Sequence, residues 1–454
     1  MRGVRVAQLS WGVWRLRIFT AVLVLAASMV SNSSWAQTPV TGPFPSWPGG
    51  SLEPAAVGPN TETVMGRPRP DYDPLGIRVG AWVFGPAAAL VGTYNSNIFA
   101  TQKGAISDFL VTESPSLSVK SDWNQHAVAL SMSGSLTQHV RRSTEDVNNA
   151  SVDLAGRYDI GYGQYISADA LYQLNHEDRS SPNAVFGKNP TEYKVMGLDL
   201  AYVHMVGRLG YRVDSTLTSY SWNNQSSSTG TTLNQHFRDR NEYVIAPRVQ
   251  YEIIPGYNAF VRALANERQY FSQECGSLVS CPAPGGIRRN SHGWEVDAGT
   301  AIEITRITTA ELYVGYLEQD YENPLLKSVT GIGFGGNIIW NVTPITTVRG
   351  SFSQSVAETT LIPASSSRET NVQLTVEHEL LRNVLLLGSV GFVHDDYQGF
   401  NRTDDTFGVD AGVRYLLNRN WSATADFNYS RRDSNIPLGG YSRIIGIASI
   451  KYGF

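Results

Sequence analysis

The stretch YSRIIGIASIKYGF (441–454) has the pattern of a membrane-spanning β-strand. Every second residue back from Phe454 to Ile444 is apolar or small, whereas Lys451 and Arg443 fall on the other side. This period of two is the signature of a strand. One face is too continuously apolar for a solvated edge strand, and the other carries charges that a protein core does not accept unpaired. The stretch therefore predicts a strand with lipid on one side and water on the other.

The amino terminus has the pattern of a secretory signal. Four arginines lie before an apolar run from Ile18 to Val30, and Ser34-Trp35-Ala36 follows as a small-x-small cleavage site. A permanent anchor helix is the alternative, but an apolar run of about 13 residues is too short to span a bilayer. We expect residues 1–36 to be a signal peptide cleaved after Ala36, and the mature chain, beginning at Gln37, to reside in the bacterial outer membrane.

The composition excludes a helical membrane protein and gives no sign of a nucleic-acid partner. The mean hydropathy of the 454 residues is -0.20, and only 17% of them are charged. After residue 36 no run of about 18 apolar residues occurs, which excludes transmembrane helices in the mature chain but not alternating strands. The formal net charge of -4 offers no basic surface for nucleic acid.

The two cysteines predict a local disulfide. Cys275 and Cys281 lie close together in the loop-like stretch QECGSLVSCPAPGG, and two such cysteines in an exported protein most simply pair and pin one loop. A metal site would need more ligands than this segment offers.

The rest of the chain divides into an extension and a barrel. Residues 37–75 are rich in Pro and Gly and predict a periplasmic extension that is too short to form a plug domain. From residue 76 to 454, alternating segments of about ten residues are separated in turn by short and long polar connections. This order is typical of an all-β, up-and-down antiparallel transmembrane barrel with about 18 strands, 16 being the alternative. A β-propeller is the structural rival, but its strands are shorter and its outward faces are not continuously apolar.

Aromatic residues recur at both edges of the outward face. In three segments two rings lie eight residues apart, which is about 26 Å along a strand and matches the height of an apolar band with aromatic girdles. The expected girdle residues are Tyr243, Tyr251, Trp294, Trp340, Phe407, Tyr415, Trp421 and Tyr429.

Charged residues of both signs alternate onto the inward face. One interpretation is that they pair across neighbouring strands and stiffen the wall. The other is that they order water and steer hydrophilic solutes, because a barrel of this strand number exceeds what side chains can fill. The expected lumen-lining residues are Asp153, Arg157, Asp169, Asp199, Arg212, Asp214, Arg248, Arg262, Glu295, Asp297, Glu311, Arg349, Asp410, Arg414, Asp426 and Lys451.

The sequence contains no recognisable catalytic or cofactor motif. The eight histidines are scattered singly, and there is no GxSxG elbow, phosphate-binding glycine loop or metal-ligand spacing. We expect no enzyme activity, no cofactor and no metal.

Several motifs at hairpin positions are similar to those of one family of outer-membrane barrels. They are RPRPDYDPLGIR (67–78), SDW (121–123), HEDRSSP (176–182), GYLEQDYENP (315–324), VEHELLRNVLL (376–386) and RDSNIP (432–437). From about residue 67 to its end, the chain resembles the family called putative β-barrel porin type 2. The resemblance implies a link to surface-polysaccharide systems and transfers no functional residue. The end of the chain, at Ile450, Tyr452 and Phe454, also resembles the signal by which such barrels are recognised for assembly.

Three functions remain in competition. The first is a porin-like channel for small hydrophilic solutes, and the second is an outer-membrane component of exopolysaccharide secretion that binds or guides the polymer. The third is a structural barrel with a blocked bore. A polymer track should show stacked aromatic rings, for which Phe260, Tyr313 and Tyr220 are the inward candidates. The expected partners are outer-membrane lipids, the barrel-assembly machinery, and either polysaccharide or small solutes.

Overall fold

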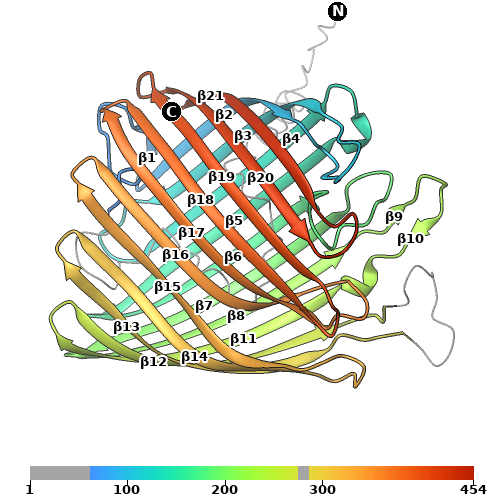
Figure 1. The fold of residues 1–454 in the computed structure, drawn as a ribbon. Coiled ribbons are helices and arrows are strands. Elements are labelled where there is room, and N and C mark those ends of the chain that lie inside the picture. The colour runs from blue at the N-terminus through green and yellow to red at the C-terminus, as the bar shows by residue number, and fades with distance from the viewer. Residues whose placement is uncertain (1–61, 275–285) are drawn as a thin grey trace, which may run out of the picture.

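The computed structural model describes residues 62–274 and 286–454. In this part of the chain, eighteen long antiparallel strands form a closed barrel in which each pairs with its neighbours in chain order (Figure 1). The ladder closes between β2 (Trp82–Asn95) and β21 (Tyr441–Gly453). The prediction of an up-and-down barrel of about 18 strands is therefore confirmed. The expected signal peptide, Cys275 and Cys281 lie outside the described residues.

The strands between β2 and β21 contain 13 to 16 residues each, long enough for a tilted strand to cross a bilayer. They are β3 (Asp108–Ser121), β4 (Ala127–His139), β5 (Val147–Gly161), β6 (Gln164–His176), β7 (Glu192–Val206), β8 (Leu209–Trp222), β11 (Arg240–Ile254), β12 (Tyr257–Tyr270), β13 (Ser291–Thr305), β14 (Thr308–Tyr321), β15 (Val329–Thr343), β16 (Thr346–Glu358), β17 (Ser366–Leu381), β18 (Val384–Gln398), β19 (Thr403–Leu416) and β20 (Trp421–Ser434). The short elements are β1 (Ile77–Val79), β9 (Gln225–Ser226), β10 (Thr232–Leu233) and the 3-10 turns η1 (Ser143–Glu145) and η2 (His236–Arg238).

Tight turns gather at one end of the barrel and longer loops at the other. Gly163 and Gly256 sit in two of the tight turns with φ of 67° and 80°, a backbone conformation that favours glycine. A side chain at Gly256 would also meet the Cβ of Glu303 at 3.1 Å. By the usual rule for outer-membrane barrels, the tight turns face the periplasm and the longer loops face outside. None of the described helices has the length and hydropathy needed to cross a bilayer.

The two faces of the sheet differ in chemistry in most of the strands. All eight aromatic residues expected in the girdles fall on the face that carries most of the exposed large apolar side chains, and only Tyr429 among them is half-buried. Two of the expected rings pack against a neighbour, Trp294 on Tyr316 at 5.8 Å and Trp421 on Tyr452 at 4.8 Å. A lipid-facing role for these rings stays a prediction.

The carboxyl end of the chain completes the seam of the barrel. Residues 87–95 of β2 pair with β21, and residues 82–84 pair with β1 along the same edge. Phe454 joins the two, because its amide donates to the carbonyl of Pro86 at 3.2 Å and its carbonyl accepts from the amide of Gly76 at 3.0 Å. Its ring also contacts Tyr452 edge-on at 5.1 Å.

We expect Phe454→Ala to lower the yield of barrel in the outer membrane severalfold. The substitution removes an aromatic pair worth about 0.5–1.5 kcal/mol at the point where the ladder closes. It also removes the ring expected to act as the assembly signal. The measurement is the amount of heat-modifiable protein in outer-membrane fractions. The control deletes residues 37–61, and equal yields from the two variants would contradict the prediction.

Candidate functional site: the lumen and its outer constriction

The cross-strand register assigns all the charged residues expected in the lumen to one face of the sheet. Asp169 lies opposite Asp199 on the next strand, and Arg262 lies opposite Asp297. At the seam that closes the barrel, Lys451 of β21 lies opposite Ala89 of β2. The inward face of β21 therefore continues into the inward face of β2. Because this face lacks most of the exposed apolar side chains, we assign it to the lumen. The role of its residues in transport remains a proposal.

Many of these charges form ion pairs along the wall. Arg262 Nη2 lies 2.6 Å from Asp297 Oδ2, and Arg212 Nη2 lies 2.8 Å from Asp214 Oδ1. Arg248 reaches from β11 to Glu311 on β14, with 3.1 Å between Nη1 and Oε1. Of these three pairs, only Arg262 with Asp297 joins neighbouring strands. That such pairs stiffen the wall stays a prediction.

Glycines on β14 and β15 allow these side chains to lie flat against the wall. The segment GIGFGGN (331–337) alternates glycine onto the inner face. A Cβ at Gly315 would come within 2.3 Å of Asp297 Oδ1, and one at Gly335 within 2.4 Å of the hydroxyl of Tyr313. Larger residues at these positions would therefore force the charged side chains toward the barrel axis.

The outer half of the lumen is narrowed by the β16–β17 hairpin, which bends inward. Its pairing with β15 ends at Gly335 and Ser353, although β16 continues to Glu358. Glu358 lies on the face that alternation assigns to lipid, yet it forms an ion pair with Arg268 on the inner face of β12. The hydroxyl of Tyr270 donates to the same carboxylate at 2.5 Å. Arg268 is 2% exposed, so this contact is fully enclosed.

An apolar cluster fixes the bent hairpin against the inner wall. Val356 of β16 packs with Leu317, Tyr321, Leu326 and Val329 of the β14–β15 region. The hairpin tip is held further by Arg289, whose Nη1 donates to the carbonyls of residues 364 and 365 at 2.8 and 3.2 Å. The inner face of β14–β15 is thus covered in the outer half of the barrel.

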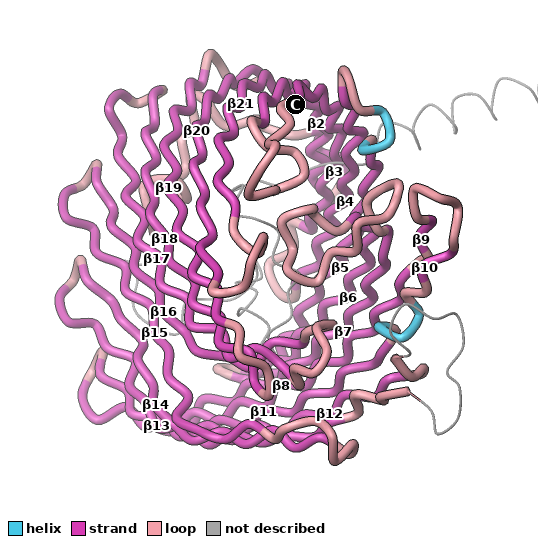
Figure 2. Tube along the Cα trace, turned by 45° about the vertical axis from the view of Figure 1, so that its right-hand side comes forward, coloured by secondary structure: helices cyan, strands magenta, loops and turns pink. Residues whose placement is uncertain are grey.

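The loop between β6 and β7 crosses the bore and meets the hairpin tip. The Oδ1 of Asn183 accepts a hydrogen bond from Thr359 Oγ1 at 3.0 Å and from the amide of Thr360 at 3.0 Å. The loop also reaches β20 and β21, where Arg432 donates to the carbonyl of Ser180. Figure 2 shows several of the longer loops lying over the bore in this way.

Two ion pairs fasten the same loop at its base. Glu177 pairs with Arg238 at 2.8 Å, and the guanidinium of Arg238 lies 3.3 Å from the ring centroid of Trp222. Asp178 pairs with Arg443 at 3.1 Å. Burial alone would raise the pKa of Asp178, but the charge of Arg443 and hydrogen bonds from Ser180 outweigh burial and hold the pKa below its ordinary value.

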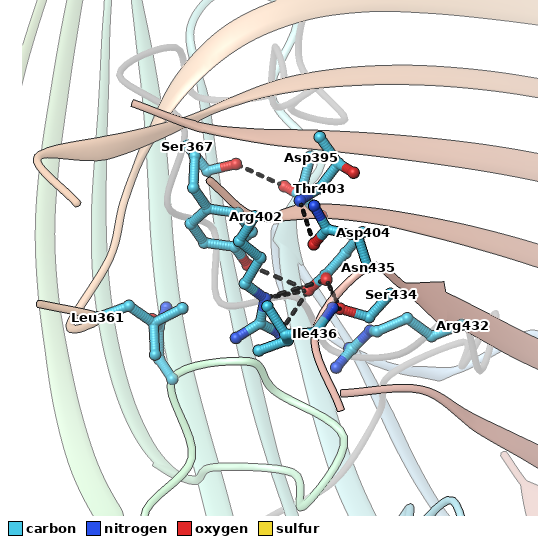
Figure 3. A network of polar contacts seen from close by, with 12 residues as sticks. Leu361, Ser367, Asp395, Arg402, Thr403, Asp404, Arg432, Ser434, Asn435 and Ile436 are labelled. Atoms are coloured by element: carbon cyan, nitrogen blue, oxygen red, sulfur yellow. Dashed lines mark hydrogen bonds and ion pairs between the residues drawn. The ribbon is translucent and has the colours of Figure 1, made fainter. Parts of the chain in front are cut away.

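A second polar network joins the outer ends of β17 to β20 (Figure 3). Asp404 is completely buried and accepts hydrogen bonds from Arg402, at 3.0 Å from Nε, and from Ser434, at 2.5 Å. Nearby, Ser367 donates to Asp395 at 2.9 Å. Because hydrogen bonds to charged groups are the stronger ones, this network holds the flank of the barrel behind the bent hairpin together.

At the opposite mouth, residues 62–76 lie against the inner rim of the barrel. Val64 is completely buried, and its amide donates to Thr347 Oγ1 at 3.1 Å. Arg69 pairs with Glu379 at 2.9 Å, both side chains being 4% exposed. The described part of the expected extension, from residue 62, is therefore attached to β16 and β17.

The alternation in the sequence predicts the strands of the barrel wall, but it does not predict the contacts at either end of the barrel. Glu377 and Glu379 around His378 have the pattern of rim charges, but they hold the amino-terminal segment through Met65 and Arg69. A signal of the bent hairpin is Glu358, which continued alternation along β16 would place on the lipid face. Among the described residues no group of three or more His, Cys, Asp or Glu side chains could hold a metal ion.

Comparison with known proteins gives one family match. The family model described as Putative beta-barrel porin 2 matches residues 69–453. No curated protein matches the chain. Among solved structures, a BenF-like porin from Pseudomonas fluorescens Pf-5 matches at 8% identity and a TM-score of 0.44, over 82% of this chain and 99% of that one.

Two further structures match at similar levels. OpdK of Pseudomonas aeruginosa with vanillate matches at 8% identity and a TM-score of 0.43, over 82% of this chain and 99% of that one. The ferric citrate transporter FecA in its unliganded form matches at 13% identity and a TM-score of 0.44, over 83% of this chain. The chain spans 64% of the length of FecA.

Proposed function

Because the chain belongs to the family described as Putative beta-barrel porin 2, we propose that this porin-like outer-membrane barrel passes small hydrophilic solutes. The observation that carries the proposal is the inner face, which bears charges of both signs on β5 to β8, β11 to β14, β16 and β19 to β21. A polar face of this kind keeps water in the bore and admits polar solutes.

The outer constriction supports small solutes over a long polymer. The loop between β6 and β7 and the tip of the β16–β17 hairpin meet across the bore through Asn183 and Thr359. A polysaccharide chain would have to keep this contact broken for as long as the polymer moved through the bore. Small solutes would need only a passage beside this contact.

The inward aromatic rings also disfavour a polymer track. Sugar rings bind by stacking on exposed aromatic faces, but arginine side chains cover these rings. Arg248 lies 3.7 Å from the ring centroid of Phe260, and Arg240 lies 4.1 Å from that of Tyr220. The remaining candidate, Tyr313, has Arg262 at 4.7 Å. Exopolysaccharide secretion therefore remains the less supported alternative.

Single-channel recording of the purified protein in planar bilayers tests the proposal. We expect discrete conductance steps and a weak ionic preference, because the charges assigned to the lumen nearly balance. We expect Asp426→Asn to shift the reversal potential toward anion preference, since it removes one inward negative charge. Heat-unfolded protein is the control. A folded protein that never conducts would favour the blocked bore.

A further inference from the structure

We propose that the outer part of the β16–β17 hairpin is a gate with two docking positions. One is the inward position described above, and in the other β16 pairs with β15 to complete the wall. Only the effect of the gate on conductance rests on the proposed channel function. The two positions themselves follow from the ladder and from the residues on either side of it.

The first observation is an open edge on β15. Its ladder with β14 continues to Val329, whereas its ladder with β16 stops at Gly335. Among the described residues, the backbone of 329–334 therefore has no β16 partner on that side. An unpaired strand edge at membrane depth is disfavoured, because lipid cannot satisfy the backbone amides and carbonyls. Ile332 on this edge is 63% exposed, one of the more exposed apolar residues in the barrel strands.

The second observation is that β16 carries the alternation needed to complete the wall as far as Ala357, the residue before Glu358. Continuing the register from Gly335 and Ser353 places Gly333 opposite Ser355 and Ile332 opposite Val356. Both members of the first pair would face the lumen, and both members of the second would face lipid. The alternation of a regular wall strand is thus preserved. Val356 is apolar, so it suits both the lipid face and the inner cluster it now occupies.

The third observation is that the inward position is held by a separable set of contacts. The hairpin is held inward by Glu358 with Arg268 of β12, by Thr359 with Asn183 of the β6–β7 loop, and by Arg289 with the tip carbonyls. Its other edge stays in the ladder, since β17 pairs with β18 along its full length. The network in Figure 3 strengthens that edge. The hairpin can therefore exchange one set of contacts for the other while β17 remains attached to the barrel.

Three cysteine pairs distinguish the positions, one for the inward position and two for the wall position, in a chain with Cys275 and Cys281 replaced by serine. Asn183→Cys with Thr359→Cys should lock the inward position, because those side chains touch at 3.0 Å. Ile332→Cys with Val356→Cys should lock the wall position. In the inward position this second bridge cannot form, because residue 332 lies on the lipid face and residue 356 packs against the inner face of the wall. Gly333→Cys with Ser355→Cys tests the same register from the luminal side and serves as the alternative if the first wall pair does not fold.

The readouts are disulfide content by peptide mass spectrometry and single-channel conductance before and after reduction. We expect both kinds of bridge to form in heat-modifiable, folded protein. The wall-locked channel should conduct at least about twofold more than the inward-locked one, since the hairpin leaves the bore. Reduction should return both to the value of the cysteine-free chain.

The outcomes separate the gate from the channel. If both wall pairs stay unbridged while the inward pair bridges fully, the wall position does not exist and the inference fails. If a wall pair bridges without changing a measurable conductance, the hairpin is not a gate and the inference also fails. If all bridges form but no variant conducts, the two positions are supported and the proposed channel function is contradicted.

Discussion

Replacing Leu374 with arginine is expected to lower the free energy of unfolding of the barrel by about 2–4 kcal/mol, the cost of a cation on the lipid face near the membrane middle. Leu374 lies in the central part of β17 and is 46% exposed on the outward face. Its cross-strand partners are Gly350 and Val390. The guanidinium would have no ion-pair partner on this face and would need to reach the interface through lipid.

The matched control is the same substitution one residue earlier. Gln373 lies at the same depth but on the inward face, between the small residues Ser351 and Gly391. Arginine there has space and faces the aqueous side, so we expect little loss of stability. The measurement is the urea dependence of folding into lipid vesicles, followed by tryptophan fluorescence. A large loss for the Gln373 variant and none for the Leu374 variant would mean that the two faces have been assigned the wrong way round.

The sequence predicts the barrel well because one local rule covers every strand. Asp426 and Ala425 illustrate it: adjacent residues in a strand point to opposite faces, so a charge beside an apolar residue settles which is inward. The same rule identified the seam strand from Lys451 and Ile450. The count of about 18 strands follows from turn chemistry, which is equally local.

The constriction escaped prediction because it depends on contacts between distant residues. Glu358 is 90 positions from Arg268, and Arg69 is 310 positions from Glu379. No periodicity relates such partners. Glu358 shows the limit of the local rule: continued alternation along β16 would turn this carboxylate outward, but the strand has left the wall. In β16 the carboxylate of Glu358 marks the place where the strand has left the wall.

Replacing Arg268 with leucine is expected to release the hairpin from the inner wall. The side chain is 2% exposed and pairs with Glu358, and its Nη2 also donates to the carbonyl of Val356 at 3.2 Å. Removing one partner of a buried ion pair costs about 3–5 kcal/mol, because the other charge is left uncompensated. We expect this loss to appear as faster hydrogen exchange in residues 354–368, with the periplasmic half of the barrel unchanged.

The control removes both charges together, in a chain carrying Arg268→Leu with Glu358→Leu. Replacing a buried pair by apolar residues is often neutral, since neither charge has to be desolvated. The double variant should therefore keep the hairpin inward beside Val356 and Leu317, with exchange rates close to those of the unmodified protein. If the single and double variants exchange equally fast, the ion pair contributes nothing of its own and the apolar cluster alone holds the hairpin. If neither variant differs from the unmodified protein, Asn183 and Arg289 are sufficient to hold the tip.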